Sequence, residues 1–314
     1  MAADALAGLR AYEQAPRGQR PRPKPEVVRI RGACLRDHGG EGPAAILVPS
    51  LINPPRILDL DEEVSLTGAI AAMGRRALLF DWGPADERSN LTVAGHVEHL
   101  LVPLLRSIDE PPALIGYCLG GTMAIAAANL TPTERVATLA APWNFARYPE
   151  KSQRALRDMW RLSEAPAKTL GALPMEILQA AFWSLDPERT VRKFAEFGRL
   201  DSAGAEARRF VELEEWANEG EPLPYWAAQE LIEDLFGKGF PSSGRWVVGG
   251  KVASSRLSVP SLHLTAQRDL IAPPETAPSG ELVAIPSGHV GMIVGSARGN
   301  VHERLRSFLR GGIT

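Results

Sequence analysis

The sequence predicts an α/β fold in which a mostly parallel sheet is covered by helices on both faces. Segments with strand and helix patterns alternate between residues 26 and 141. The strand segments are continuous apolar runs, such as residues 44–48, and such runs are typical of parallel strands buried on both faces. In addition, Gly116-Tyr-Cys-Leu-Gly120 joins an apolar strand to an Ala-rich helix, which is the pattern of a nucleophile elbow.

The elements in this first part of the chain are assigned by hydrophobic periodicity. Alternation indicates an edge strand, continuous apolar runs indicate buried strands, and apolar residues three or four apart indicate helices. Pro103 should bend or restart the helix in which it lies. The expected elements are an edge strand over residues 26–31, buried strands over residues 44–48, 77–80, 113–117 and 136–141, and helices over residues 61–73, 91–108 and 122–130.

The alternation stops at Pro142, and the next hundred or so residues contain helical segments but no convincing buried strand. Five of the seven tryptophans lie in this part. A helical insert within an α/β sheet is typical of a cap over an active site, and we expect some of these rings to face the groove beneath it. The helical segments are residues 155–162, 175–183, 190–197, 205–216 and 225–235; the sheet resumes at 261–265 and 281–285, and residues 301–309 form a last helix.

These patterns divide the chain into an arm, a core and a cap. Residues 1–25 are expected to be a flexible Pro- and Arg-rich arm, with only a weakly amphipathic piece near its start. Residues 26–141 and 241–314 would form the α/β core, and residues 142–240 the helical cap insert.

Composition excludes several classes of function. A net charge of −2 gives no general argument for nucleic-acid binding. The two cysteines, Cys34 and Cys118, make no disulfide framework, the N-terminus lacks the apolar core typical of a signal peptide, and no run of about 18 apolar residues occurs. We therefore expect a cytoplasmic protein without a transmembrane segment. Neither metal-ligand spacing nor a dinucleotide-binding glycine motif occurs, so neither a metal nor a cofactor is expected.

The elbow makes Cys118 the candidate nucleophile. In this motif the strand and helix pass so closely that the positions two before and two after the nucleophile have no room for a side chain. Gly116 and Gly120 meet that demand, and Gly121 is expected to add freedom at the start of the helix. The alternative interpretation is a Gly-rich turn that happens to hold a small buried cysteine.

A nucleophile of this kind needs a base, and the base needs an acid that orients it. Asp269 and His289 each follow a predicted strand, and the carboxyl ends of parallel strands lie at one edge of a sheet. We therefore expect His289 to be the base and Asp269 the acid. Asp81, which also follows a buried strand, is the alternative acid, although its Trp-Gly-Pro sequel fits a turn better.

The oxyanion hole should use the backbone N–H of Leu119, the residue after the nucleophile. A second N–H should come from the loop after the strand over residues 44–48, where Leu51 and Ile52 are both candidates. Pro49 is excluded because proline has no N–H.

A cysteine nucleophile favours thioester chemistry. Its acyl-enzyme is itself a thioester, so forming it from an acyl-CoA exchanges one thioester for another. That intermediate can acylate a hydroxyl, and a cap that excludes water would favour this transfer over hydrolysis.

The motifs resemble those of the polyhydroxyalkanoate synthase family. The elbow Gly116-Tyr-Cys-Leu-Gly-Gly121 is similar to the G-x-C-x-G-G box of the synthases. The segment Val48-Pro-Ser-Leu-Ile-Asn53 with Ile57-Leu-Asp-Leu60 resembles their V-P-x-x-I-N…I-L-D-L segment, and the loops around Asp269 and His289 resemble their acid and histidine loops. The resemblance implies an α/β-hydrolase fold, a Cys-His-Asp triad that acts on hydroxyacyl-CoA, and a homodimer or a partner subunit.

Three hypotheses follow from the residues and the resemblance. The first is an acyltransferase that forms an acyl-Cys118 thioester from 3-hydroxyacyl-CoA and passes it to a hydroxyl acceptor. The second is a Cys-dependent thioesterase or esterase on the same fold. The third is a catalytically silent homologue that binds a partner or a granule, for which Cys118 should be buried away from His289.

Overall fold

The computed structural model describes residues 2–18, 20 and 22–311. Residues 1, 19 and 21 of the expected arm and residues 312–314 of the expected core lie outside this range. Among the described residues, eight strands form one sheet in the order β1-β2-β4-β3-β5-β6-β11-β12. The strands are β1 (Glu26–Ile30), β2 (Ala33–Asp37), β3 (Ala44–Val48), β4 (Arg76–Asp81), β5 (Ala113–Tyr117), β6 (Arg135–Leu139), β11 (Ser261–Ala266) and β12 (Glu281–Ile285).

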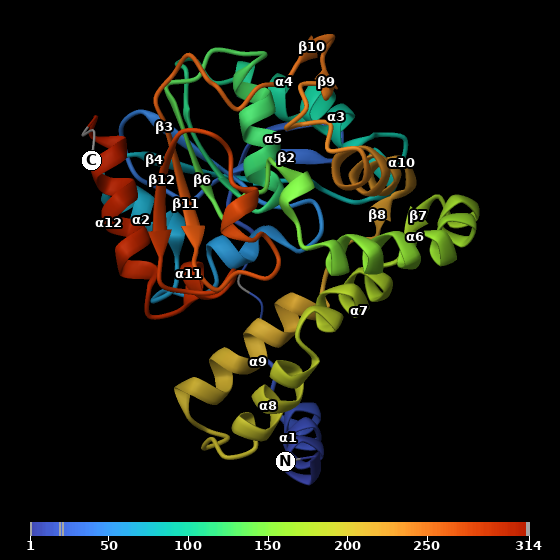
Figure 1. Ribbon diagram of the computed structural model, residues 1–314. Coiled ribbons are helices and arrows are strands. Elements are labelled where there is room, and N and C mark those ends of the chain that lie inside the picture. The colour runs from blue at the N-terminus through green and yellow to red at the C-terminus, as the bar shows by residue number, and fades with distance from the viewer. Residues whose placement is uncertain (1, 19, 21, 312–314) are drawn as a thin grey trace.

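The sheet is parallel from β4 to β12, and β2 joins it antiparallel to β4. Successive side chains of a strand point to opposite faces, and both faces carry a hydrophobic cluster. In β3, Ile46 belongs to one cluster and Leu47 to the other. The fold is therefore the doubly covered α/β sheet that the continuous apolar runs predict (Figure 1).

Helices of the core pack on the two faces of the sheet. One face carries α3 (Val93–His96), η3 (Val97–Leu101), α4 (Val102–Arg106) and α5 (Leu119–Ala128), and the other carries η1 (Pro55–Leu58), α2 (Leu66–Ala72), α11 (Gly291–Val294) and α12 (Arg298–Leu309). Short turns η2 (Asp86–Arg88), η4 (Phe145–Arg147) and η6 (Pro274–Thr276) and the hairpin β9 (Val247–Val248) with β10 (Lys251–Val252) complete this part.

Two local expectations are corrected by the structure, and a third is refined. Strand β2 was not expected; it forms a hairpin with β1 through Arg31, whose φ of 52° is unusual for arginine. Helix α2 begins only after Ser65, because the Asp61 carboxylate accepts the N–H groups of Glu63 and Val64 and holds a turn instead. The long helix before the elbow changes to a π-helical stretch, η3, and resumes as α4 at Val102 with Pro103 in its first turn, which agrees with the expected restart.

Between β6 and β11 the chain leaves the sheet and forms a helical region at one side of the core (Figure 1). All five helical segments expected there are present, with longer bounds. They are α6 (Glu150–Leu170), α7 (Met175–Leu185), α8 (Pro187–Phe197), α9 (Ala205–Asn218), and α10 (Tyr225–Gln229) continuing as η5 (Glu230–Gly237). Two short strands that were not expected, β7 (Ala172–Leu173) and β8 (Leu223–Pro224), pair with each other.

The N-terminal segment differs from the expectation of a flexible arm. Helix α1 (Ala2–Gln14) packs against α8, so closely that a Cβ at Gly8 would lie 1.8 Å from the Phe194 carbonyl oxygen. The Tyr12 ring meets the rings of Phe194 and Phe210 edge-on. Arg17 then pairs with Glu215 of α9 at 2.7 Å. The start of the chain therefore covers the outer side of the α8–α9 lobe. Within the described residues, no helix has the length and apolar character needed to cross a membrane.

Candidate active site

Cys118 lies at the sharp turn between β5 and α5. Its φ of 55° and ψ of −133° are a conformation that side chains other than glycine rarely adopt. Cys118 occupies the N-cap position of α5, and its side chain is partly exposed. The backbone thus has the strained geometry of a nucleophile elbow, and the thiol lies at the N-terminus of a helix, where a negative charge is favoured.

Close approach of the backbone explains the three glycines around Cys118. A Cβ at Gly116 would lie 2.3 Å from Gly121 Cα, and one at Gly120 would lie 2.2 Å from the Val48 carbonyl oxygen. Gly121 has a different role from the one expected. A Cβ there would lie 2.4 Å from Ala141 Cβ, so Gly121 is required by contact between α5 and the sheet and not by freedom at the helix start.

The structure brings His289 and Asp269 together at the carboxyl edge of the sheet. Asp269 follows β11 and His289 follows β12. His289 Nδ1 lies 2.7 Å from Asp269 Oδ2, and both side chains are buried. Asp269 Oδ1 accepts the N–H groups of Ile271 and Ala272 at 2.8 and 2.9 Å. The carboxylate is therefore fixed by the backbone and in turn fixes one face of the imidazole.

The charges around His289 favour its protonated form. Burial alone would lower its pKa, but the negative charges of Asp269 and the Cys118 thiolate, with hydrogen bonds to both, raise the pKa of His289 from 6.5 to about 10. The imidazole is therefore held as a cation in the cavity that Cys118 also lines. The thiolate is the reactive form of cysteine.

Tyr117 is a member of this site that the sequence reasoning missed. Its ring packs on His289 with centroids 5.1 Å apart, and its hydroxyl donates to the His289 carbonyl oxygen at 3.4 Å. Burial, followed by the nearby charges of Cys118 and Asp269, raises the pKa of Tyr117 well above its ordinary value, so the phenol stays neutral. Its place next to the nucleophile in the elbow motif was the signal that could have found it.

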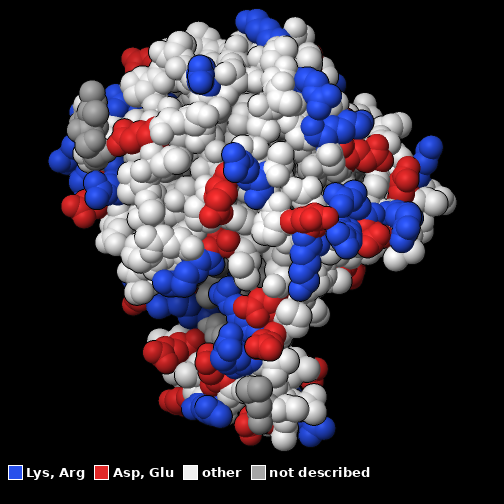
Figure 2. Space-filling model, viewed as in Figure 1, with Lys and Arg blue, Asp and Glu red and all other residues white. Residues whose placement is uncertain are grey.

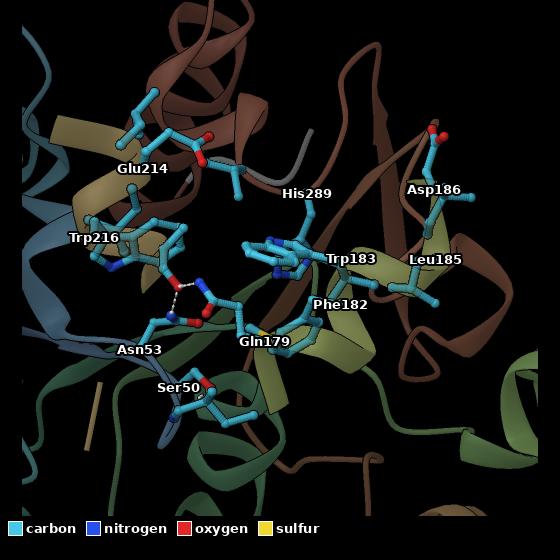
Figure 3. A pocket seen from close by; sticks show the side chains of 18 of the residues that line it. Ser50, Asn53, Gln179, Phe182, Trp183, Leu185, Asp186, Glu214, Trp216 and His289 are labelled. Atoms are coloured by element: carbon cyan, nitrogen blue, oxygen red, sulfur yellow. Dashed lines mark hydrogen bonds between the residues drawn. The ribbon is translucent and has the colours of Figure 1, made fainter. Parts of the chain in front are cut away.

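Cys118 and His289 line one cavity of about 390 Å³ between the core and the helical region. Figure 3 shows Trp216 and Glu214 of α9 on one side and Phe182, Trp183 and Leu185 of α7 on another, with His289 between them in this view. Two of the tryptophans expected to face the groove, Trp183 and Trp216, therefore do so, whereas Trp160 is buried among the helices.

The loop after β3 is held by the C-terminal end of α9. Trp216 Nε1 donates to the Pro54 carbonyl oxygen at 2.9 Å, and Asn53 Nδ2 donates to the Ala217 carbonyl oxygen at 3.4 Å. Gln179 of α7 donates to the same Ala217 oxygen at 3.5 Å, as the dashed lines in Figure 3 show. The loop expected to supply the second oxyanion donor is thus held by α7 and α9 of the helical region.

The expected oxyanion donors lie on two segments, the start of α5 and the loop after β3. Leu119 is the first residue of α5, directly after Cys118. Leu51 and Ile52 lie in the loop after β3, but the Ile52 N–H donates to Ser50 Oγ at 3.3 Å. Ile52 nevertheless lines the cavity of Cys118, whereas Leu51 does not, so both stay candidates for the second donor.

The alternative acid, Asp81, is engaged elsewhere. It accepts from Arg36 Nε and from the Gly83 N–H, both at 3.0 Å, and so holds a turn after β4. Other histidines also have partners away from Cys118: His38 pairs with Asp59, His96 with Arg88, and His263 with Thr138. In the described part of the chain, no group of three or more His, Cys, Asp or Glu side chains could hold a metal ion.

Comparison with known proteins gives sequence relatives but no matching family model. The chain is 27% identical over 270 residues to the poly(3-hydroxyalkanoate) polymerase subunit PhaC of Haloferax mediterranei, which covers 80% of this chain and 55% of that protein. The PhaC subunit of Haloarcula marismortui is 27% identical, with coverage of 85% and 60%. That of Allochromatium vinosum is 25% identical, with coverage of 84% and 79%. The chain thus spans little more than half the length of the two archaeal relatives.

Solved structures agree on the fold. An esterase from Thermogutta terrifontis has a TM-score of 0.52 and 18% identity, covering 94% of this chain and 99% of that chain. A Mycobacterium tuberculosis protein, Rv0554, has a TM-score of 0.56 and 16% identity, covering 90% and 94%. The chain has the α/β-hydrolase fold, and its sequence is similar to the polyhydroxyalkanoate synthases, as its motifs predict.

Proposed function

We propose that the protein is a Cys-dependent acyltransferase that forms an acyl-Cys118 thioester from 3-hydroxyacyl-CoA and transfers the acyl group to a hydroxyl acceptor. One observation carries the proposal. Cys118 lines the same cavity as His289, and His289 is paired with Asp269 at 2.7 Å. The similarity to poly(3-hydroxyalkanoate) polymerase subunits supports hydroxyacyl-CoA as the substrate class.

In the first step, the Cys118 thiolate attacks the carbonyl carbon of the substrate thioester while the proton resides on His289. Asp269, on the other ring nitrogen, stabilises the imidazolium. The Leu119 N–H and an N–H of the loop after β3, that of Leu51 or Ile52, stabilise the oxyanion. When the tetrahedral intermediate collapses, its C–S bond to CoA breaks, and His289 gives its proton to the departing CoA thiolate.

In the second step, His289 takes the proton of the acceptor hydroxyl, whose oxygen attacks the acyl-Cys118 carbonyl. Collapse forms an ester and releases the Cys118 thiolate beside protonated His289. No metal or cofactor enters either step. The resemblance further suggests a homodimer or a partner subunit, and we propose a cytoplasmic protein.

Incubation with 3-hydroxybutyryl-CoA, followed by intact-mass and peptide mass spectrometry, tests the proposal. We expect an added acyl mass on Cys118, release of free CoA, and an ester product. The Cys118→Ala variant should give no adduct. Normal turnover by that variant would show that the mechanism is wrong.

Hydrolysis is the second candidate, because Cys118 is partly exposed and water can reach it. In the same assay a thioesterase releases CoA and free hydroxy acid with no ester product. A silent homologue forms no adduct at all. Its expected feature is a Cys118 buried away from His289, and the cavity that both residues line argues against it.

A further inference from the structure

A second cavity, of about 460 Å³, adjoins the one that holds Cys118. It lies along α8 and is walled on the other side by Phe210 of α9. Arg189, Lys193 and Phe210 line both cavities, and Arg192 lines the second alone. The two cavities are therefore neighbours: one is lined by Cys118 and the other lies along α8.

Among the described residues, two of the three cations that line the second cavity have no carboxylate partner. Lys193 pairs with both carboxylate oxygens of Glu214 at 2.7 Å and is already satisfied. Arg189 and Arg192 are exposed, and within the described residues neither guanidinium has a carboxylate partner. On the core side of the first cavity, Arg268 is also exposed, and its guanidinium donates to the Pro286 carbonyl oxygen at 3.1 Å.

Basic and acidic side chains are mixed on the surface where the core meets the lobe of α8 and α9 (Figure 2). Cations are in excess in the lining of the second cavity. Glu196 is the one carboxylate among the residues that line the second cavity, where it faces three cations. With a net charge of −2 over the whole chain, this positive rim is a local feature and not a consequence of overall composition.

We propose that Arg189, Arg192 and Arg268, here called the arginine rim, bind the phosphate groups of the CoA portion of the substrate. This inference rests on the proposed function, because it names how a CoA thioester would be held at that same site. Guanidinium groups bind phosphate oxygens through paired, charge-assisted hydrogen bonds. A CoA thioester also has the required shape, with a reactive thioester at one end and phosphates at the far end of a long arm.

The walls between the two ends suit that arm. Trp183, Phe182 and Phe210 line the first cavity and give it a mainly apolar surface. Phe210 is half-buried and stacks on Phe197 with centroids 4.5 Å apart, so its ring is held in place where the cavities meet. In the proposed binding mode, the uncharged pantetheine arm lies along these apolar walls and the phosphates contact Arg189 and Arg192.

Direct binding tests the arginine rim without any turnover. Isothermal titration of Cys118→Ala with CoA and with pantetheine, which lacks all phosphates, should give CoA the tighter binding. Adding Arg189→Gln and Arg192→Gln should weaken CoA binding by about tenfold or more and leave pantetheine less affected, because charge-assisted bonds to phosphate are lost. Arg157→Gln is the matched control, since Arg157 is an exposed arginine of α6 that lines neither cavity.

A kinetic comparison completes the test in the full-length protein. The rates of Cys118 acylation by 3-hydroxybutyryl-CoA and by 3-hydroxybutyryl-pantetheine are measured for each variant. We expect the ratio of the CoA rate to the pantetheine rate to fall about tenfold in the double variant and to be restored in part by Arg192→Lys in place of Arg192→Gln. High salt should reduce the same ratio.

The outcomes separate the two proposals. CoA binding that is no tighter than pantetheine binding, or that does not depend on Arg189 and Arg192, overturns the arginine rim even if Cys118 is acylated. Equal losses for both thioesters also overturn it, because they indicate general damage to the cavity. If CoA binds in an arginine-dependent manner but no thioester acylates Cys118, the rim stands and the acyltransferase proposal fails.

Discussion

At the scale of single residues, the elbow depends on the absence of side chains around Cys118. A Cβ at Gly116 would meet Gly121 Cα at 2.3 Å, and the three nearest atoms all belong to the backbone of Gly120 and Gly121, so no flexible side chain can move away. We expect Gly116→Ala to destabilise the protein by about 3 kcal/mol or more, at or beyond the usual upper range for overpacking.

Urea denaturation measures this loss, and Gly299→Ala is the matched control. Gly299 lies in α12, and a Cβ there would meet nothing within 4 Å. Alanine is the better helix former, so the control should be neutral or more stable by about 0.5–1 kcal/mol. A Gly116→Ala protein as stable as the control would mean that strand and helix are not packed as described.

Asp269 offers a second prediction at this scale. In Asp269→Asn, the side-chain oxygen can still accept the N–H groups of Ile271 and Ala272, which leaves the amide NH₂ facing His289. The NH₂ cannot accept from Nδ1–H, so the imidazole must take the wrong tautomer. We expect the rate of Cys118 acylation to fall about 10²- to 10⁴-fold.

Rapid-quench mass spectrometry measures that rate, with circular dichroism to confirm folding. The control is Asp81→Asn, which changes the alternative acid. Because Asp81 binds Arg36 and Gly83, its loss should affect stability and not acylation. The opposite ranking of the two variants would exchange their roles.

The sequence predicts which candidate site residues lie at one edge of the sheet, because their chemistry and their order in the chain form a pattern. Cys118, Asp269 and His289 each follow a strand, and parallel strands bring their carboxyl ends to one edge. The contact of Gly121 with Ala141 was not predictable, since it depends on the distance between α5 and the neighbouring strand.

At the scale of elements, the C-terminal end of α9 is hydrogen-bonded to the loop after β3. Trp216 Nε1 donates to Pro54, within the loop that contains Leu51. Trp216→Phe keeps most of the apolar ring but removes the donor. We expect a stability loss of about 1 kcal/mol, and about a tenfold slower acylation at saturating thioester because the oxyanion loop is less well positioned.

Trp160→Phe is the control for this prediction. Trp160 is equally buried, and its Nε1 donates to Glu233 at 2.9 Å, away from the loop. It should lose similar stability without slowing acylation. If both variants slow acylation equally, the cap affects the rate only through its general stability.

Element boundaries were predictable where periodicity alone decides them. The helices of the cap were found because their apolar residues recur at helical spacing. The start of α2 was not, because the side chain of Asp61 competes for backbone N–H groups and delays the helix to residue 66. Which cap residues would meet the loop after β3 could not be predicted, since they are more than 150 positions away in the chain.

At the scale of the whole molecule, apolar patterning predicts the covered sheet, but the placement of peripheral segments depends on tertiary contacts. Helix α1 is weakly amphipathic and gives little indication in sequence that it packs on α8. Only the folded arrangement brings Tyr12 against the rings of Phe194, Phe197 and Phe210. The same packing fixes the outer side of the lobe that carries Arg189 and Arg192.

The buried histidines predict how the stability of the whole molecule depends on pH. Burial, reinforced by the charge of Arg88, lowers the pKa of His96 to about 3, and burial lowers the pKa of His263 to about 4. In the unfolded chain these groups take up protons near pH 6.5. Their contribution to stability is therefore present above pH 6.5 and is lost as the pH falls towards 4 and 3.

His289 has the opposite sign, because its pKa is raised from 6.5 to about 10. Its contribution is full below pH 6.5, where both folded and unfolded states are protonated, and is lost as the pH rises from 6.5 to about 10. We therefore expect the urea midpoint to be highest near pH 6.5 and to fall on both sides. The His289→Gln variant should keep the acidic fall but flatten the alkaline one, because glutamine does not titrate. An alkaline fall of equal size in that variant would mean that Cys118 and Asp269 do not hold a proton on His289 in the folded protein.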